Sequence, residues 1–122
     1  MFQGKAEAAL RFYASLFPGS KIAEISRYGP QGPGPEGTVI RAVLQAGGLS
    51  ILASDTFIEH GFTFTPSFSF FVSCDSEEEL RRLAAALAEA GKEYMPIGDY
   101  GFSRLFAWVG DRYGVSWQLN LE

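Results

Sequence analysis

The sequence contains only one cysteine, Cys74, and only one histidine, His60, among its 122 residues. A single cysteine excludes an intramolecular disulfide and is typical of proteins from a reducing compartment. We therefore expect a cytoplasmic protein. A helix is predicted to begin just after Cys74, and a helix N-terminus lowers the pKa of a thiol. Since no histidine accompanies Cys74 in the sequence, a buried, unreactive thiol is the favoured interpretation.

Basic residues and long apolar runs are also scarce. Ten Lys and Arg residues stand against fourteen Asp and Glu residues, which gives a formal net charge of −4. Without a basic excess to neutralise phosphates, a nucleic-acid partner is not expected. No segment approaches the ~20 apolar residues of a membrane helix, and Met1 does not begin a signal peptide, so no membrane association is expected.

Apolar and aromatic side chains, by contrast, are plentiful. Hydrophobic residues make up 47% of the chain and aromatic residues 15%, and eleven of the aromatic residues are phenylalanine. A chain of this length forms one domain and buries roughly two thirds of its unfolded surface. The composition predicts a folded domain with aromatic surface left over for a pocket or a partner.

Two segments show the residue spacing of amphipathic helices. The first covers residues 6–17 and is followed by Pro18-Gly19, which stops a helix. The second covers residues 77–90, and Ser76 with Glu79 forms a capping box at its start. Both segments are therefore predicted to be helices with one buried face.

Seven other segments have the length and composition of strands. They are residues 21–28, 38–45, 49–55, 68–72, 93–96, 102–109 and 115–121. Gly47-Gly48 is a tight hairpin connection between two of them, and residues 110–114 connect the last two. Most neighbouring strands are therefore expected to pair in an antiparallel manner.

The order of these elements indicates an internal repeat. After Ser67 the order is strand, helix and three strands, and the order from Met1 is the same without its first strand. This predicts a single α+β domain with a βαβββ module at residues 1–56, a linker at 57–66 and a second module at 67–122. Each module would be a curved, mostly antiparallel sheet with one helix on its outer face. The inner faces would need cover from each other or from a partner chain.

Alternation along the last predicted strand separates its side chains into two sets. Trp117, Leu119 and Leu121 are expected under the second helix. The residues on the opposite face are Ser116, Gln118 and Asn120. In the first half, the residues on the corresponding face are Ser50, Leu52 and Ser54. Polar residues on an inner face indicate either a wet or ligand-filled cavity or simple exposure to bulk water.

Six phenylalanines crowd into residues 57–71. Core packing explains most of them, because burial of such a ring contributes roughly 1.5–3 kcal/mol. Phe71 falls on the same face as Ser69, and together with Trp108 or Phe106 across the sheet it could line an apolar pocket.

His60 lies in the predicted linker, with Asp55 and Glu59 nearby. Its unperturbed pKa of about 6.5 suits a general base, or a ligand brought over the mouth of a cavity. The alternative is an exposed linker histidine with no chemical role.

The segment of residues 29–37 holds four glycines and three prolines. Phosphate-binding loops act through backbone N–H groups, which proline lacks, so this segment is not predicted to bind phosphate. It forms either a semi-rigid flap beside the cavity or a long hairpin connection.

Several stretches together carry a family resemblance. They are Phe2-Gln3-Gly4-Lys5-Ala6-Glu7, Arg11-Phe12-Tyr13, Arg27-Tyr28-Gly29-Pro30, Gly34-Pro35-Glu36-Gly37, Phe62-Thr63-Phe64-Thr65-Pro66, Phe106-Ala107-Trp108-Val109 and Asp111-Arg112-Tyr113-Gly114-Val115-Ser116-Trp117-Gln118-Leu119. In these stretches, which cover nearly the whole chain, the sequence resembles the PhnB-like branch of the vicinal oxygen chelate superfamily. That superfamily includes glyoxalases, bleomycin-resistance proteins and extradiol dioxygenases.

The resemblance implies a homodimer with ligand cavities inside the βαβββ cups, and often a divalent metal held by His, Gln and Glu. The last-strand metal ligand of the family falls on Gln118, and its counterpart in the first module is Leu52, which cannot coordinate a metal. The first-strand ligand of the second module falls near Ser67. Only Gln118 remains from the family pattern, with His60 as the other weak candidate, so no metal or other cofactor is expected.

Three functions follow as hypotheses. The first is a small-ligand binding protein of the bleomycin-resistance type, and the candidate ligand-binding residues are Ser50, Leu52, Ser67, Ser69, Phe71, Trp108, Ser116 and Gln118. The second is a metal-dependent lyase, isomerase or dioxygenase. The third is a structural dimer with filled cups.

No catalytic residue can be assigned from the sequence. Some members of this branch carry the name of a ubiquinone-pathway O-methyltransferase. The sequence lacks the glycine-rich turn between a parallel strand and a helix that such enzymes normally show, so it does not support methyl transfer.

Overall fold

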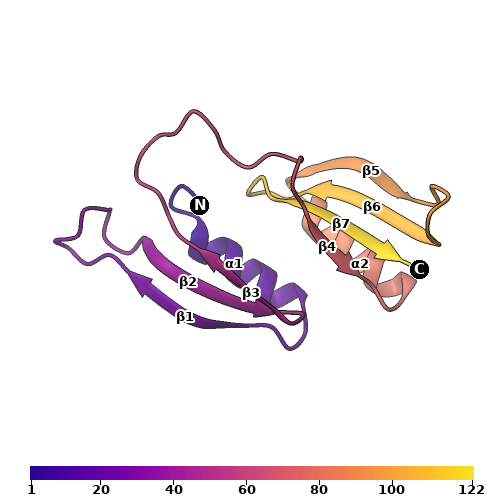
Figure 1. The fold of residues 1–122 in the computed structure, drawn as a ribbon, viewed down its shortest axis with the longest axis horizontal. Coiled ribbons are helices and arrows are strands. Elements are labelled where there is room, and N and C mark those ends of the chain that lie inside the picture. The colour runs from indigo at the N-terminus through magenta and orange to yellow at the C-terminus, as the bar shows by residue number, and fades with distance from the viewer. The chain divides into compact units, whose positions relative to one another are not determined.

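The computed structural model describes residues 1–122, which divide into two units at residues 1–61 and 62–122. Each unit contains one helix and one sheet (Figure 1). The elements of the first unit are α1 (Ala6–Leu16), β1 (Lys21–Arg27), β2 (Val39–Ala46) and β3 (Leu49–Ala53). Those of the second are β4 (Phe70–Ser73), α2 (Glu77–Ala88), β5 (Lys92–Gly98), β6 (Leu105–Gly110) and β7 (Ser116–Leu121). Neither helix is long and apolar enough to cross a membrane.

The first sheet has the strand order β1-β2-β3 and is antiparallel throughout. Its hairpin turn is Gly47-Gly48, where both residues have positive φ angles, of 56° and 82°. Such angles favour glycine, which has no Cβ to clash. Next to β3 there is one isolated parallel bridge, between Phe2 and Asp55. In the first unit, Phe2 therefore takes the place that the whole strand β4 occupies in the second unit.

The second sheet has the order β4-β7-β6-β5. β4 pairs parallel to β7, and the other two pairings are antiparallel. The predicted α+β class, with two helices and two mostly antiparallel sheets, is confirmed. The arrangement is compatible with a glyoxalase-like fold.

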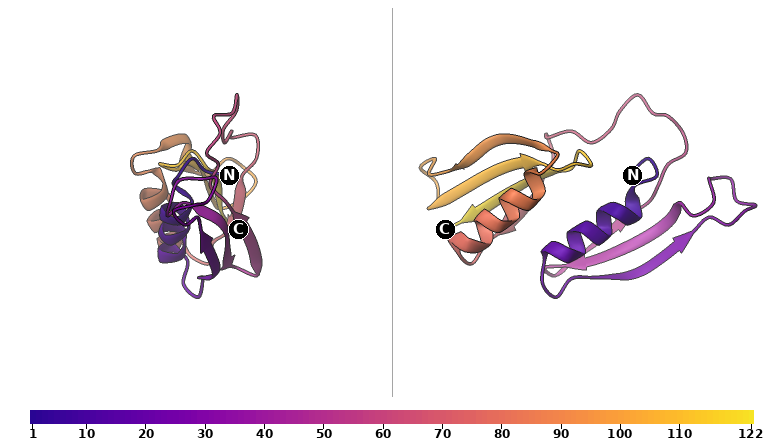
Figure 2. Two further views of the ribbon diagram at one scale, coloured as in Figure 1. Left: turned by 90° about the vertical axis from the view of Figure 1, so that its left-hand side faces the viewer. Right: turned by 180° about the vertical axis from the view of Figure 1, so that it is seen from behind.

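Each helix lies along one face of its own sheet (Figure 2). The buried residues of α1 are Ala6, Ala9, Leu10, Tyr13 and Leu16, and those of α2 are Leu80, Leu83, Ala84 and Leu87. Trp117, Leu119 and Leu121 are buried as predicted. The core of each unit therefore lies between its helix and one face of its sheet. We call the other face, which no helix of the same unit covers, the open face.

Both helices end slightly earlier than predicted, at Leu16 and Ala88. The second helix ends because Glu89, with φ −61° and ψ 124°, is already extended, and Ala90 follows with a positive φ of 59°. At the next position, a Cβ on Gly91 would collide with the carbonyl oxygen of Gly110. Backbone packing against the end of β6, which periodicity does not report, therefore sets this boundary.

Candidate functional site

The open face of the second sheet carries a cluster of polar side chains. β7 lies between β4 and β6, and Gln118 is paired with Phe71 on one side and with Trp108 on the other. Directly paired residues project from the same face of a sheet. Phe71, Trp108 and Gln118 therefore share the open face, as alternation predicts.

Hydrogen bonds join Ser69, Trp108, Ser116 and Gln118, which we call the Ser116 cluster. The indole Nε1–H of Trp108 donates to Ser116 Oγ at 2.8 Å, and the Oγ atoms of Ser116 and Ser69 lie 2.5 Å apart. Gln118 Nε2 donates to Ser69 Oγ at 3.4 Å. Ser116 is 2% exposed, so water does not reach its hydroxyl. These bonds give the buried hydroxyl its hydrogen-bond partners.

Asn120 continues the polar row of β7 beyond the Ser116 cluster. It is paired with Phe106 and is 8% exposed. Its Oδ1 atom is buried and has no hydrogen-bond partner. An unpaired buried acceptor costs about 1–3 kcal/mol of desolvation and is unusual in a folded protein. Alternation placed Asn120 on this face, but no sequence signal showed that it would be buried and unpaired.

Aromatic rings surround this polar row. Phe71 is 59% exposed, although it belongs to a strand. The ring of Trp108 lies 5.0 Å from that of Tyr94, measured between centroids. Phe106 contacts Phe102 edge to face, with centroids 4.9 Å apart. The second sheet thus presents a polar row between apolar walls.

The candidate residues of the first unit lie on the open face of its own sheet. Leu52 is paired with Val43 and is 59% exposed, and the exposed Ser50 lies two residues before it. The same face carries an exposed ion pair between Arg41 Nε and Glu24 Oε1 at 3.1 Å. This face therefore carries exposed charged side chains beside the exposed Leu52, although Val43 on the same face is buried.

Ser67 differs from the other predicted site residues of the second unit. It precedes β4, and its Oγ lies 2.6 Å from Thr65 Oγ1. Its hydroxyl thus closes a local turn. Ser69, Phe71, Trp108, Ser116 and Gln118 are brought together without it.

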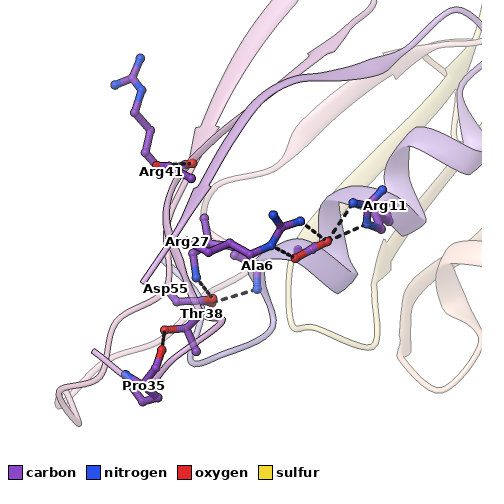
Figure 3. A network of polar contacts seen from close by, with 10 residues as sticks. Ala6, Arg11, Arg27, Pro35, Thr38, Arg41 and Asp55 are labelled. Carbon is purple, nitrogen blue, oxygen red and sulfur yellow. Dashed lines mark hydrogen bonds and ion pairs between the residues drawn. The ribbon is translucent and has the colours of Figure 1, made fainter. Parts of the chain in front are cut away.

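Asp55 has a structural role that the sequence did not reveal (Figure 3). Its Oδ1 accepts the backbone N–H of Ala6 at 2.9 Å, and its Oδ2 accepts that of Val39 at 2.8 Å. The side chain at the helix N-cap, Lys5, makes no capping bond, so Asp55 supplies the missing acceptor at the start of α1.

The other two linker candidates form no metal centre. His60 Nε2 lies 2.9 Å from Thr56 Oγ1. Glu59 is exposed. No group of three His, Cys, Asp or Glu side chains gathers closely enough to hold a metal ion.

A charged network links α1 to β1 (Figure 3). Glu7 accepts bonds from Arg27 Nε at 2.8 Å and from Arg11 Nε at 2.9 Å. Hydrogen bonds from Arg27 and then from Arg11 lower the pKa of Glu7 from 4.5 to about 2. The network stabilises the contact of the helix with the sheet and lies away from the open face.

Cys74 is buried at the turn between β4 and α2. Burial, with a smaller contribution from Glu79, raises the pKa of its thiol to about 11. A thiol with such a pKa is protonated at neutral pH and is a poor nucleophile. The interpretation of Cys74 as unreactive agrees with this environment.

The segment of residues 29–37 connects β1 to β2 and folds onto the ring of Tyr28. A Cβ added at Gly32 or at Gly34 would lie 2.7 Å from a ring carbon of Tyr28. Phe57 meets the same ring edge to face, with centroids 6.1 Å apart. The glycines are therefore needed so that the backbone can approach the ring, and the segment is a packed connection.

Comparisons with known proteins give a consistent result. The family model described as 3-demethylubiquinone-9 3-methyltransferase matches residues 1–120. A solved structure from Bacillus cereus, whose description names PhnB and the same methyltransferase, is 50% identical with a TM-score of 0.96, over 100% of this chain and 95% of that one. Protein PA1353 from Pseudomonas aeruginosa is 29% identical with a TM-score of 0.86, over 99% and 92%. No curated protein matches the chain.

Proposed function

Because the chain belongs to the PhnB-like family whose model is named 3-demethylubiquinone-9 3-methyltransferase, we propose that it is a cytoplasmic vicinal oxygen chelate protein that binds a small organic ligand. The βαβββ modules would act as cups, and the ligand would lie against the open face of the second sheet. The observation that carries this proposal is the polar row of β7, which is enclosed by aromatic side chains. A small-molecule site has this composition: apolar walls with a few placed polar groups.

A homodimer is part of the proposal. Large apolar side chains remain exposed in both units, among them Leu52, Phe62, Phe68 and Phe71. Exposed apolar patches of sufficient size mark protein–protein interaction sites. A second copy of the chain that covered the open face of the second sheet would enclose the ligand and bury Phe71. Ser50 and Leu52 would be ligand-binding residues of the open face of the first sheet.

The methyltransferase name describes the family, and the residues of this chain do not fit the methyl donor. S-adenosylmethionine sites normally use a glycine-rich turn between a parallel strand and a helix. The corresponding turn here, between β4 and α2, is Cys74-Asp75-Ser76 and has no glycine. The turn therefore does not support methyl transfer.

A metal-dependent lyase, isomerase or dioxygenase has weaker support. Such a site needs several converging nitrogen or oxygen donors with one open position. Gln118 is hydrogen-bonded to Ser69, which in turn is linked to Ser116 and Trp108, and none of these three residues is a usual ligand of a catalytic metal. The donor set does not fit this chemistry.

The two tryptophans provide an internal test of ligand binding. The indole N–H of Trp108 bonds to Ser116 on the open face, whereas that of Trp117 bonds to Asp111 Oδ2 at 2.9 Å on the helix face. Titration with 4-ethylphenol, followed by proton–nitrogen NMR, should shift the Trp108 indole signal in a saturable manner. The Trp117 signal should move much less.

A Trp108→Phe variant assigns the two signals. If the Trp108 signal does not move at millimolar 4-ethylphenol, or if both signals move together and without saturation, the proposed site is wrong. Sedimentation velocity tests the dimer separately, since a monomer at micromolar concentration would contradict it.

A further inference from the structure

We propose that the open face of the second sheet selects an uncharged, flat ligand that carries a hydroxyl or N–H donor, and that Asn120 accepts this donor. The inference rests on the proposed function and deepens it by naming the ligand class. Three properties of the face support this class: the charge of its strands, its hydrogen-bond balance and its aromatic walls.

The three strands that carry the polar row and its direct neighbours have no charged residue, whereas Lys92 of β5, paired with Gly110 opposite Ser116, is an exposed cation at the margin of this face. β4, β6 and β7 have the sequences FFVS, LFAWVG and SWQLNL, without a single Asp, Glu, Lys, Arg or His. Burying an ionised group against such a face without a partner is costly. A ligand that lies on these strands is therefore neutral where it touches them.

The Ser116 cluster presents a donor to the ligand. Ser116 is almost fully buried and already accepts a bond from Trp108, so its own proton needs an acceptor within the protein. Ser69 Oγ is the acceptor in reach, at 2.5 Å. Ser69 then accepts from both Ser116 and Gln118, and its own hydroxyl proton is left to point outward.

Asn120 presents the acceptor. Its Oδ1 is the one buried side-chain oxygen or nitrogen atom in residues 1–122 that has no partner. The terminal torsion of asparagine is soft, so the amide can turn its oxygen toward a ligand at little cost. A donor on the ligand would pair this oxygen, whereas a ligand without a donor would leave it unpaired.

The walls favour a flat ring. On the neighbouring strands, Phe71 and Trp108 are paired with Gln118 and Phe106 is paired with Asn120, and Phe71 is largely exposed. Aromatic rings pack well against other rings in offset or edge-to-face geometry. A phenol-like or lactam-like molecule combines such a ring with the required donor.

Three probes of similar size test the assignment by isothermal titration calorimetry. They are 4-ethylphenol, which has a donor; 4-ethylanisole, in which methylation removes the donor; and 4-ethylbenzoate, which is charged. We expect 4-ethylphenol to bind roughly tenfold more tightly than either of the others, because sites that pair a hydroxyl discriminate against analogues that lack it.

The Asn120→Ala variant separates the donor effect from the added methyl group. In this variant, 4-ethylphenol and 4-ethylanisole should bind with nearly equal affinity, since the acceptor is gone. Gln3→Ala, which removes an exposed side-chain amide outside the second unit, is the control and should retain the full preference.

The outcomes are distinct. Equal binding of the phenol and the anisole to the natural protein, or a preference that survives in Asn120→Ala, would overturn the assignment to Asn120 while leaving ligand binding intact. Tighter binding of the benzoate would show that the site takes an anion and would overturn the neutral class. If none of the three probes binds, both this inference and the proposed function are wrong.

Discussion

The two sheets of this protein differ in one strand, and that strand changes the character of the face opposite the helix. In the second unit β7 is an interior strand between β4 and β6, whereas in the first unit β3 has β2 on one side and the single Phe2 bridge on the other. Ser116 and Asn120 are consequently buried, while Leu52 and Ser50 remain exposed.

The position of a strand within its sheet decides whether its polar side chains need hydrogen-bond partners. Polar residues on an edge strand are solvated and need no partner. On an interior strand flanked by large rings they lose water, and each must find a partner within the protein or in a ligand. The four residues of the Ser116 cluster bond to one another, but Asn120 Oδ1 has no partner. The second sheet is therefore the better candidate for binding.

Trp117 in the core of the second unit is the position where we expect a substitution to lower the free energy of unfolding most. Trp117 packs on Phe70 with centroids 4.9 Å apart and donates to buried Asp111. Trp117→Ala removes both contacts, and we expect it to lower the free energy of unfolding by about 3–5 kcal/mol in denaturant melts. A loss below about 1 kcal/mol would show that the helix face and the open face are reversed.

The buried carboxylates provide the next comparison. Asp111 accepts bonds from the N–H groups of Tyr113, Val115 and Trp117, whereas Asp55 accepts two. Alanine at position 111 should cost about 3 kcal/mol and alanine at position 55 about 2 kcal/mol, because buried donors lose their acceptor. Thermal and denaturant unfolding measure both.

Asp99→Ala is the matched control, because exposed Asp99 accepts one bond, from Gly101, in a turn. It should cost less than about 1 kcal/mol. Equal losses for all three aspartates would contradict the assignment of structural roles to the two buried ones.

A smaller, pH-dependent effect is expected from Glu7, which ties α1 to β1. Its pKa is lowered from 4.5 to about 2 by Arg27 and Arg11. The stabilisation is therefore present above pH 4.5 and is lost as the pH falls through the window toward 2. Glu7→Gln should cost less than about 1 kcal/mol at pH 7, since the pair is at the surface.

Urea melts at pH 7 and near pH 2 test this prediction. The stability difference between Glu7→Gln and the natural protein should shrink at the lower pH. An unchanged difference would show that the carboxylate charge is not responsible. Glu89→Gln is a control, because its contact with Arg112 is long, at 3.9 Å.

The smallest stability effect is expected at Gln118. This residue is half-buried, and its bond to Ser69 is long, at 3.4 Å. Gln118→Ala should change the free energy of unfolding by less than about 0.5 kcal/mol and should instead weaken ligand binding. A large loss of stability with unchanged affinity would assign Gln118 to the fold and remove it from the site.

Much of the fold could be predicted because local signals agreed with it. Pro18-Gly19 and the capping box at Ser76 placed the helices, and alternation placed Trp117 under α2. The role of Asp55 could not be predicted, because its partner Ala6 lies 49 residues away in the sequence. No local pattern identifies a helix cap supplied from such a distance.

Only the part of the site that lies within one strand could be predicted from the sequence. Alternation grouped Ser116 with Gln118, but the contacts to Ser69 and Trp108 depend on strand order and register. Irregular pairing between β5 and β6 adds to the difficulty, since the register shifts between Glu93 and Met95. The unpaired oxygen of Asn120 arises from this three-dimensional arrangement and has no sequence signature.

The buried thiol of Cys74 can report local unfolding at the turn between β4 and α2. The thiol is shielded, and its backbone N–H is bonded to the carbonyl oxygen of Asn120 at 2.7 Å, one residue before the end of β7. Separation of the β4–α2 turn from β7 would expose the sulfur to an alkylating reagent. Because the chain has one thiol, the rate of alkylation would report local opening of the second unit without any introduced label.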